Sequence, residues 1–199
     1  MEAIHTPHPA RPRGSAIIEF AFSLLLLIPL LLGTYAFGLN FIRSIQVTQL
    51  TRDAGHMYAR NVDFSLTANQ NFLRRLAAGL NLNAVIILST VRMISDADCS
   101  GAGLSGSACT NRGQAVFANR IVVGSPALGS SYFGAPPTTD SKGNVSWTDQ
   151  LRDSRTRANH FTSVMDLQPG EMAYVAETIL PTPDVSFGLT SEVYARSIF

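Results

Sequence analysis

The stretch RPRGSAIIEFAFSLLLLIPLLL, residues 11–32, opens the hydrophobic run that decides the fold of this chain. From Phe20 to Ile42 there are 23 consecutive residues without a charged side chain. At about 1.5 Å per helical residue, this run is long enough to cross a hydrocarbon core of roughly 30 Å. The sequence therefore predicts a single transmembrane helix, which we place at residues 15–42.

The charges beside this run predict its orientation. Arg11 and Arg13 precede it, and Glu2 is the only acidic residue before them. Because positively charged flanks tend to stay in the cytoplasm, we expect a cytoplasmic N-terminus and one exported domain formed by residues 43–199. Arg43, directly after the run, is a weaker signal for the opposite orientation.

Three interpretations of this N-terminus are open. The first is an ordinary signal anchor, with Glu19 at the membrane interface. The second is a secretory signal peptide cleaved after Ala36, although the hydrophobic run is longer than the roughly 7–15 residues that such peptides contain. The third is a prepilin leader, residues 1–14, which is cleaved on the cytoplasmic side between Gly14 and Ser15.

The acidic side chain of Glu19 favours the prepilin interpretation. A carboxylate at the centre of a membrane costs about 2.5–3.5 kcal/mol on insertion scales, and less near the edge, so it needs a partner. Cleavage after Gly14 would create an amino group on Ser15, one helical turn before Glu19. The positive end of the helix dipole would also favour an acid there. In an assembly, we expect Glu19 to pair with the amino group of a neighbouring subunit and set the axial register.

The stretch RGSAIIEFAFSLLLLIPLLLGTYAFG, which carries Gly14, Glu19, Phe20 and Pro29, resembles the opening of TadE-like proteins. These are minor pilins or pseudopilins of the tight-adherence (Flp-type) pilus machinery. The similarity continues into VTQLTRDAGHMYAR, residues 47–60, and extends weakly into QPGEMAYVAETILPTP.

The resemblance implies a type IV pilin-like precursor that an aspartic prepilin peptidase cleaves. It assigns Gly14 and Ser15 to processing, and Glu19, Phe20 and Pro29 to assembly. The expected partners are the bacterial inner membrane, the peptidase and other pilin or Tad-machinery subunits, with the domain in the periplasm or incorporated into a surface pilus. The alternative is an unprocessed, single-pass membrane-anchored periplasmic module that binds or scaffolds other proteins.

Apolar residues beyond the membrane run predict that the first helix continues. Val47, Leu50, Ala54 and Met57 recur at steps of three and four, which is the period of an amphipathic helix. We therefore expect one helix over about residues 16–61.

A second helix is predicted shortly after the first. Thr67 and Gln70 fit a capping box at its start, and Gly79 fits a C-cap at its end. The expected buried residues are Phe72, Leu73 and Leu76. The neighbouring Arg74 and Arg75 are expected to face solvent.

Four segments have the composition of β-strands. Residues 84–94, 115–124 and 171–180 are rich in β-branched residues, and the tail 191–199 alternates apolar and polar side chains. An antiparallel sheet would bury the apolar stripe of the first helix. The fold class that we expect is α+β: a long N-terminal transmembrane helix, a second short helix and a small antiparallel sheet, as in pilins.

The segment 124–165 between the second and third strands is rich in Gly, Ser and Pro. Such a long irregular connection is usually functional or mobile. We expect a short helix near residues 148–157. Its aromatic residues Tyr132, Phe133 and Trp147 either pack locally or form a contact surface for other pilus components.

Cys99 and Cys109 are the only two cysteines, ten positions apart in a Gly/Ser-rich stretch. In an oxidising periplasm we expect them to form a disulfide worth about 2–3 kcal/mol. No histidine lies at a spacing that would complete a zinc site with them, so no metal site is expected.

The composition argues against other classes of function. Charged residues make up 15% of the chain and the net charge is +1, which leaves no basic surface for nucleic acid. The chain lacks a G-x-S-x-G elbow, an H-E-x-x-H helix and a phosphate loop. His56 and His160 are interpreted as structural residues. We therefore expect neither an enzyme nor a cofactor or small-molecule substrate.

Overall fold

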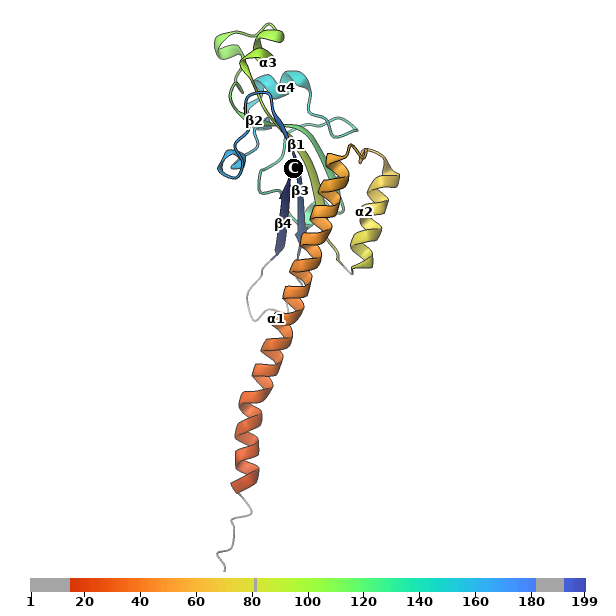
Figure 1. Cartoon of the computed structure of the whole chain (residues 1–199), viewed down its shortest axis with the longest axis vertical. Coiled ribbons are helices and arrows are strands. Elements are labelled where there is room, and N and C mark those ends of the chain that lie inside the picture. Colours follow the sequence, from red (N-terminus) through yellow and green to blue (C-terminus); the bar gives the residue numbers. More distant parts are fainter. Residues whose placement is uncertain (1–14, 81, 182–191) are drawn as a thin grey trace, which may run out of the picture. The chain divides into compact units, whose positions relative to one another are not determined.

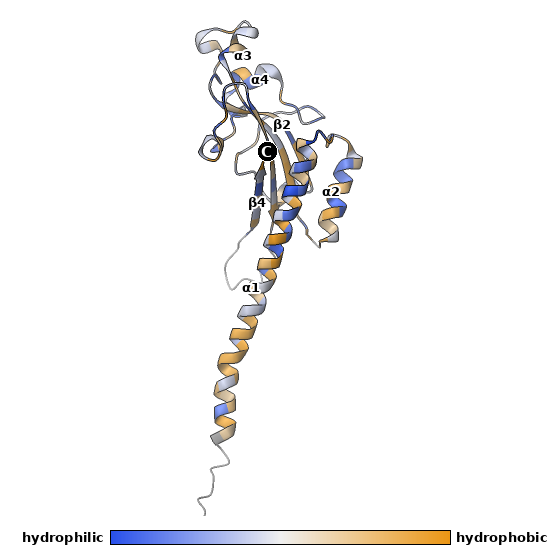
Figure 2. Cartoon of the chain, in the orientation of Figure 1, coloured by the Kyte–Doolittle hydropathy of each residue, from blue (hydrophilic) through white to orange (hydrophobic). Residues whose placement is uncertain are grey.

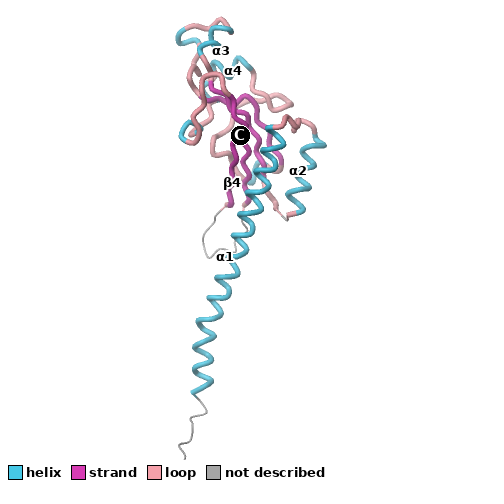
Figure 3. Tube along the Cα trace, viewed as in Figure 1, coloured by secondary structure: helices cyan, strands magenta, loops and turns pink. Residues whose placement is uncertain are grey.

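The computed structural model describes residues 15–80, 82–181 and 192–199. The predicted leader, residues 1–14, lies outside them. The helices and strands follow one another along the chain as shown in Figures 1 and 3. The elements are α1 (Ser15–Ala59), α2 (Thr67–Gly79), β1 (Val85–Met93), α3 (Asp96–Gly101), β2 (Ala115–Val123), α4 (Trp147–Arg152), β3 (Met172–Leu180) and β4 (Val193–Ile198), with short 3-10 helices at Gly106–Ala108, Pro126–Leu128, Ser154–Thr156 and Phe161–Ser163.

The chain forms two compact units, which meet between Phe41 and Ile42. The first unit contains the N-terminal part of α1. The second contains the rest of α1 and all other elements, and its α+β architecture confirms the predicted fold class. The four strands form one antiparallel sheet in the order β2-β1-β3-β4.

The C-terminal part of α1 packs on the sheet as its apolar period predicted. Val47, Leu50 and Ala54 are buried in one core cluster with residues of the sheet, whereas Met57 is only partly buried. The helix ends two residues earlier than predicted, at Ala59. Asn61 then adopts a left-handed conformation, φ 62°, in a C-terminal cap of the kind that asparagine tolerates.

Helix α2 exists as predicted, but its start differs from the prediction. Thr67 is the first helical residue and not the cap, and the N-cap residue Leu66 makes no side-chain capping bond. The turn before the helix is held instead by Asp63, whose carboxylate accepts the N–H of Ser65 at 2.8 Å. Gln70 also holds this turn, because its side-chain amide donates to the backbone carbonyl of Phe64, the residue after Asp63.

The buried face of α2 is also rotated from the predicted one. Leu73 and Ala77 are buried, Leu76 is partly buried, and Phe72 is 54% exposed. Gly79 is the last helical residue and Leu80 is the C-cap, so the predicted glycine cap was wrong by one position. Small Ala77 allows close packing on the core, which leaves the larger Phe72 on the outside.

The two faces of the sheet are covered by different segments. On one face, α1 and α2 close a core that includes Ile86 and Leu88 of β1. On the other face, the connection between β2 and β3 contributes buried Phe133 and Phe161 to a second core around Val175. The long connection is therefore part of the domain core, and local packing is confirmed for Phe133.

The rest of this connection is closer to solvent. Its predicted helix forms as α4 but ends at Arg152, followed by the 3-10 turn Ser154–Thr156. Trp147 is 40% exposed, and the guanidinium of Arg92 lies 4.9 Å from its ring centre. Tyr132 is likewise exposed.

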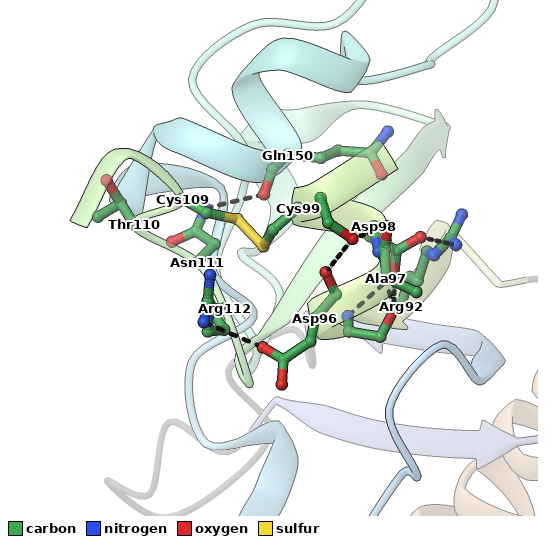
Figure 4. The surroundings of a disulfide bond; sticks show 12 residues. Arg92, Asp96, Ala97, Asp98, Cys99, Cys109, Thr110, Asn111, Arg112 and Gln150 are labelled. Carbon is green, nitrogen blue, oxygen red and sulfur yellow. Dashed lines mark hydrogen bonds and ion pairs between the residues drawn. A yellow bond between two sulfur atoms is a disulfide. The ribbon is translucent and has the colours of Figure 1, made fainter. Parts of the chain in front are cut away.

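Cys99 and Cys109 form the predicted disulfide, with their Cα atoms 5.8 Å apart (Figure 4). The stretch around them is more regular than its Gly/Ser content suggested. Ser95 and Asp98 make a reciprocal capping box that starts α3, which carries Cys99. The disulfide is buried against Ile94 and Leu151.

Candidate functional site

Most residues in the N-terminal part of α1 are hydrophobic (Figure 2). Its large side chains are exposed from Ile17 to Ile45, and Phe20 is 64% exposed. In the part of the chain that the structure describes, α1 is the one helix long and apolar enough to cross a membrane. Because such a surface is stable only when lipid or other helices cover it, this segment is the candidate membrane and assembly site.

The start of α1 positions the predicted processing and assembly residues. The helix begins at Ser15, so its backbone nitrogen and Glu19 are separated by one turn, a rise of about 6 Å. The hydroxyl of Ser23 donates to the backbone carbonyl of Glu19 at 2.8 Å, which continues the same helical face by one more turn. Gly14 lies outside the described residues. Whether Gly14, Ser15 and Glu19 take the expected roles stays a prediction.

Pro29 lies inside α1, where it has no N–H to donate to the carbonyl of Leu25. The helix nevertheless continues through it from Ser15 to Ala59. Shortly after Pro29, the hydroxyl of Thr34 donates to the carbonyl of Leu30 at 2.8 Å. The C-terminal half of the same helix packs in the domain core, so the exposed apolar surface is restricted to the N-terminal half.

A buried carboxylate on β3 secures the domain that α1 enters. Glu177 is 0% exposed and accepts hydrogen bonds from the Ser131 hydroxyl at 2.5 Å, the Tyr132 N–H at 2.9 Å and the Tyr194 hydroxyl at 2.7 Å. It thereby joins the β2–β3 connection and the edge strand β4 to the sheet. Burial, followed by the hydrogen bond to Glu177, raises the pKa of the Tyr194 phenol above its ordinary value.

The role of Glu177 was not predicted from the sequence, although a signal was present. Alternation along β3 places Glu177 between Val175 and Ile179 on one face of the sheet. A single acid among inward-facing apolar residues indicates a buried, hydrogen-bonded carboxylate.

The disulfide region carries a second buried polar cluster. Asp98 accepts from the Ser95 N–H at 2.9 Å and from Arg92 at 2.5 Å. Desolvation is the largest single influence and raises the pKa of Asp98, but the Ser95 hydrogen bonds and the Arg92 charge together hold it below its ordinary value. Asn111, fully buried, donates to the carbonyls of Gln150 and Asp153 and so fixes the end of α4.

The two histidines of the domain contact aromatic rings. His56 lies 4.6 Å from the ring of Phe199, and His160 lies 5.5 Å from that of Tyr132, measured between ring centres. Within residues 15–80, 82–181 and 192–199, no three His, Cys, Asp or Glu side chains come together as metal ligands. That the chain is not an enzyme stays a prediction.

Comparison with known proteins identifies one relationship. Residues 14–56 match the family model described as TadE-like protein. No curated protein and no solved structure matches the chain. The match covers the apolar half of α1, including Glu19, Phe20 and Pro29, and reaches into the half that packs on the sheet. The N-terminal segment of this chain, residues 14–56, thus matches the TadE-like family model, in agreement with the resemblance seen in the sequence.

Proposed function

We propose that this protein is a minor pilin or pseudopilin-like structural component of a tight-adherence type IV pilus or secretion assembly. A single observation carries the proposal: the TadE-like match coincides with an exposed apolar helix in which Glu19 follows Ser15 by one turn. The family match supports a component associated with the Tad pilus. Our proposal goes beyond this match in assigning the protein the role of a subunit that a peptidase processes.

The proposed mechanism has three steps. The chain inserts into the inner membrane with residues 1–14 in the cytoplasm and the domain in the periplasm. A prepilin peptidase then hydrolyses the peptide bond between Gly14 and Ser15 and leaves a free amino group on Ser15. Finally, the apolar half of α1 packs against the helices of other subunits, and Glu19 pairs with an N-terminal amine to set the register.

The division of α1 into two parts supports this mechanism. From Val47 onward, the apolar face of α1 packs against the sheet and α2, so this half of the helix is part of the domain core. The half from Ile17 to Ile45 keeps its large apolar side chains exposed. In lipid this surface is solvated by acyl chains, and in an assembly equivalent helices take their place.

The proposal is tested by changing the charge of Glu19 in cells that express the complete Tad system. Glu19→Gln keeps the size of the side chain but removes its charge, so we expect the protein to stay in the membrane and to be lost from cross-linked assemblies. Ser23→Ala, one turn later on the same helix, is the matched control and should assemble normally. Normal assembly of Glu19→Gln would contradict the proposed pairing.

A further inference from the structure

A polar hollow of about 330 Å³ lies at the edge strand β2 of the second unit. Three segments line it: the start of α2, strand β2, and the turn that precedes α4. Its polar lining includes Arg120, Thr139, Asp140, Ser141 and Lys142. A concave site with converging polar groups is the usual form of a small-ligand site.

Arg120 is the unusual residue in this hollow. Its guanidinium is partly buried, and its Nε is inaccessible to solvent and has no hydrogen-bond partner. In the described part of the chain, no carboxylate lies within ion-pair distance of it. Burial lowers the pKa of Arg120, and the more distant charge of Glu177 partly offsets this effect. A partly buried cation without an anion in contact is unfavourable, so Arg120 is a position that an anionic ligand would stabilise.

The acids near Arg120 are already occupied. Glu177 accepts three hydrogen bonds from Ser131, Tyr132 and Tyr194. Asp140, the acid that lines the hollow, accepts the backbone N–H groups of Lys142 and Asn144 and the side-chain amide of Asn144. Each carboxylate is therefore held by local donors.

Further donors surround Arg120. Lys142 lines the hollow, and its ammonium group makes no hydrogen bond or ion pair to any described residue. Its charge acts on Asp63 and Asp140 from a greater distance. The exposed hydroxyls of Thr139 and Ser141 likewise have no partner among the residues described.

The start of α2 borders the hollow. This helix of 13 residues begins at Thr67 without a side-chain cap, and Ser65 and Gln70 beside that end line the hollow. The N-terminus of a helix carries positive partial charge and favours a nearby anion.

We propose that this hollow binds a phosphate group. Arg120, Lys142, Thr139 and Ser141 supply donors from two different segments, which suits the oxygens around a tetrahedral phosphate better than the two oxygens of a carboxylate. The phosphate belongs either to a small soluble molecule or to a phospholipid headgroup. The inference does not depend on processing or on Glu19.

The test uses the full chain in a maltoside detergent, which contains no phosphate. Inorganic phosphate and dihexanoyl phosphatidylglycerol are titrated separately, and binding is measured by calorimetry and by the rise in melting temperature. We expect saturable binding of at least one probe. Binding of inorganic phosphate indicates a soluble ligand, and binding of the lipid alone indicates a headgroup. No binding of either probe overturns the proposal.

Matched variants locate the site. Arg120→Gln should weaken binding at least about tenfold, the effect of losing one charged hydrogen bond. Arg75→Gln, an exposed arginine of α2 outside the hollow, should leave affinity unchanged. Equal losses in both variants would indicate nonspecific charge binding and overturn the proposal.

A second variant keeps the test decisive if Arg120→Gln does not fold. The double change Thr139→Val and Ser141→Ala alters exposed side chains and leaves Arg120 in place. It should fold normally and weaken binding several-fold. Unchanged affinity in this variant would contradict the site.

Discussion

Replacing Glu177 by alanine should destabilise the domain more than replacing any exposed acid. The substitution leaves three donors without their acceptor: the Ser131 hydroxyl, the Tyr132 N–H and the Tyr194 hydroxyl. Hydrogen bonds to a charged group contribute about 1.5–3 kcal/mol each, so three would sum to about 4.5–9 kcal/mol. The bonds from Tyr132 and Tyr194 are only partly buried, and water can replace them. We therefore expect a loss of about 3–5 kcal/mol, the range for breaking a buried charge network.

The chain contains a suitable reporter for this loss. Trp147 is the only tryptophan, and it lies in the connection that Glu177 secures. Urea unfolding of the full chain in detergent, followed by Trp147 fluorescence, should show the midpoint falling strongly for Glu177→Ala and less for Glu177→Gln, which keeps the volume and one acceptor.

The matched control is Glu171→Gln, an exposed acid at the start of the same strand region. It should change the free energy of unfolding by no more than about 0.5 kcal/mol. Equal unfolding midpoints for Glu177→Ala and Glu171→Gln would contradict this prediction, because the buried network would then contribute nothing measurable.

Two further predictions concern the disulfide region. Replacing Cys99 and Cys109 by alanine should lower the free energy of unfolding by about 2–3 kcal/mol, checked by urea unfolding beside the oxidised wild type, and an unchanged midpoint would argue against a stabilising disulfide. Because the folded pKa of Asp98 is lowered, its contribution to stability is present above the unfolded pKa of about 3.9 and is lost as pH falls through the lower folded value. The stability difference between wild type and Asp98→Asn should thus be largest near neutral pH and shrink below about pH 4, and a difference independent of pH would contradict this account.

Periodic features of the sequence predicted the elements well. The steps of three and four from Val47 to Ala54 identified the buried face of α1, and β-branched composition located β1, β2 and β3. These signals are informative because the apolar residues of a helix or strand recur with the period of the face that is buried in the core. The disulfide was also predictable, because two cysteines allow only one pairing.

Local capping signals were less reliable, and the two candidate boxes show why. Thr67 and Gln70 have the right spacing, yet Gln70 bonds to the preceding turn and the helix starts at Thr67. Ser95 and Asp98 have an equivalent spacing and do form a box. The choice depends on which neighbouring groups compete for the same donors, and a sequence pattern does not contain that information.

The polar sites of the domain depend on contacts between distant segments. Glu177 meets Ser131 across 46 positions, and Arg120 lies in a hollow lined by α2 and a distant turn. The sequence around Glu177 does not predict its hydrogen bonds, and the sequence around Arg120 does not predict that it lacks an ion pair. The N-terminal candidate site was proposed from the sequence because its residues follow one another closely in the chain, from Gly14 to Pro29, and their assigned roles stay predictions.

The intact mass of the protein, extracted from membranes that contain a prepilin peptidase, distinguishes a processed subunit from an unprocessed one. Cleavage between Gly14 and Ser15 predicts a mature chain that begins at Ser15, with the amino group that Glu19 needs one turn away. A chain that retains residues 1–14 would contradict processing and support the unprocessed membrane-anchored module instead.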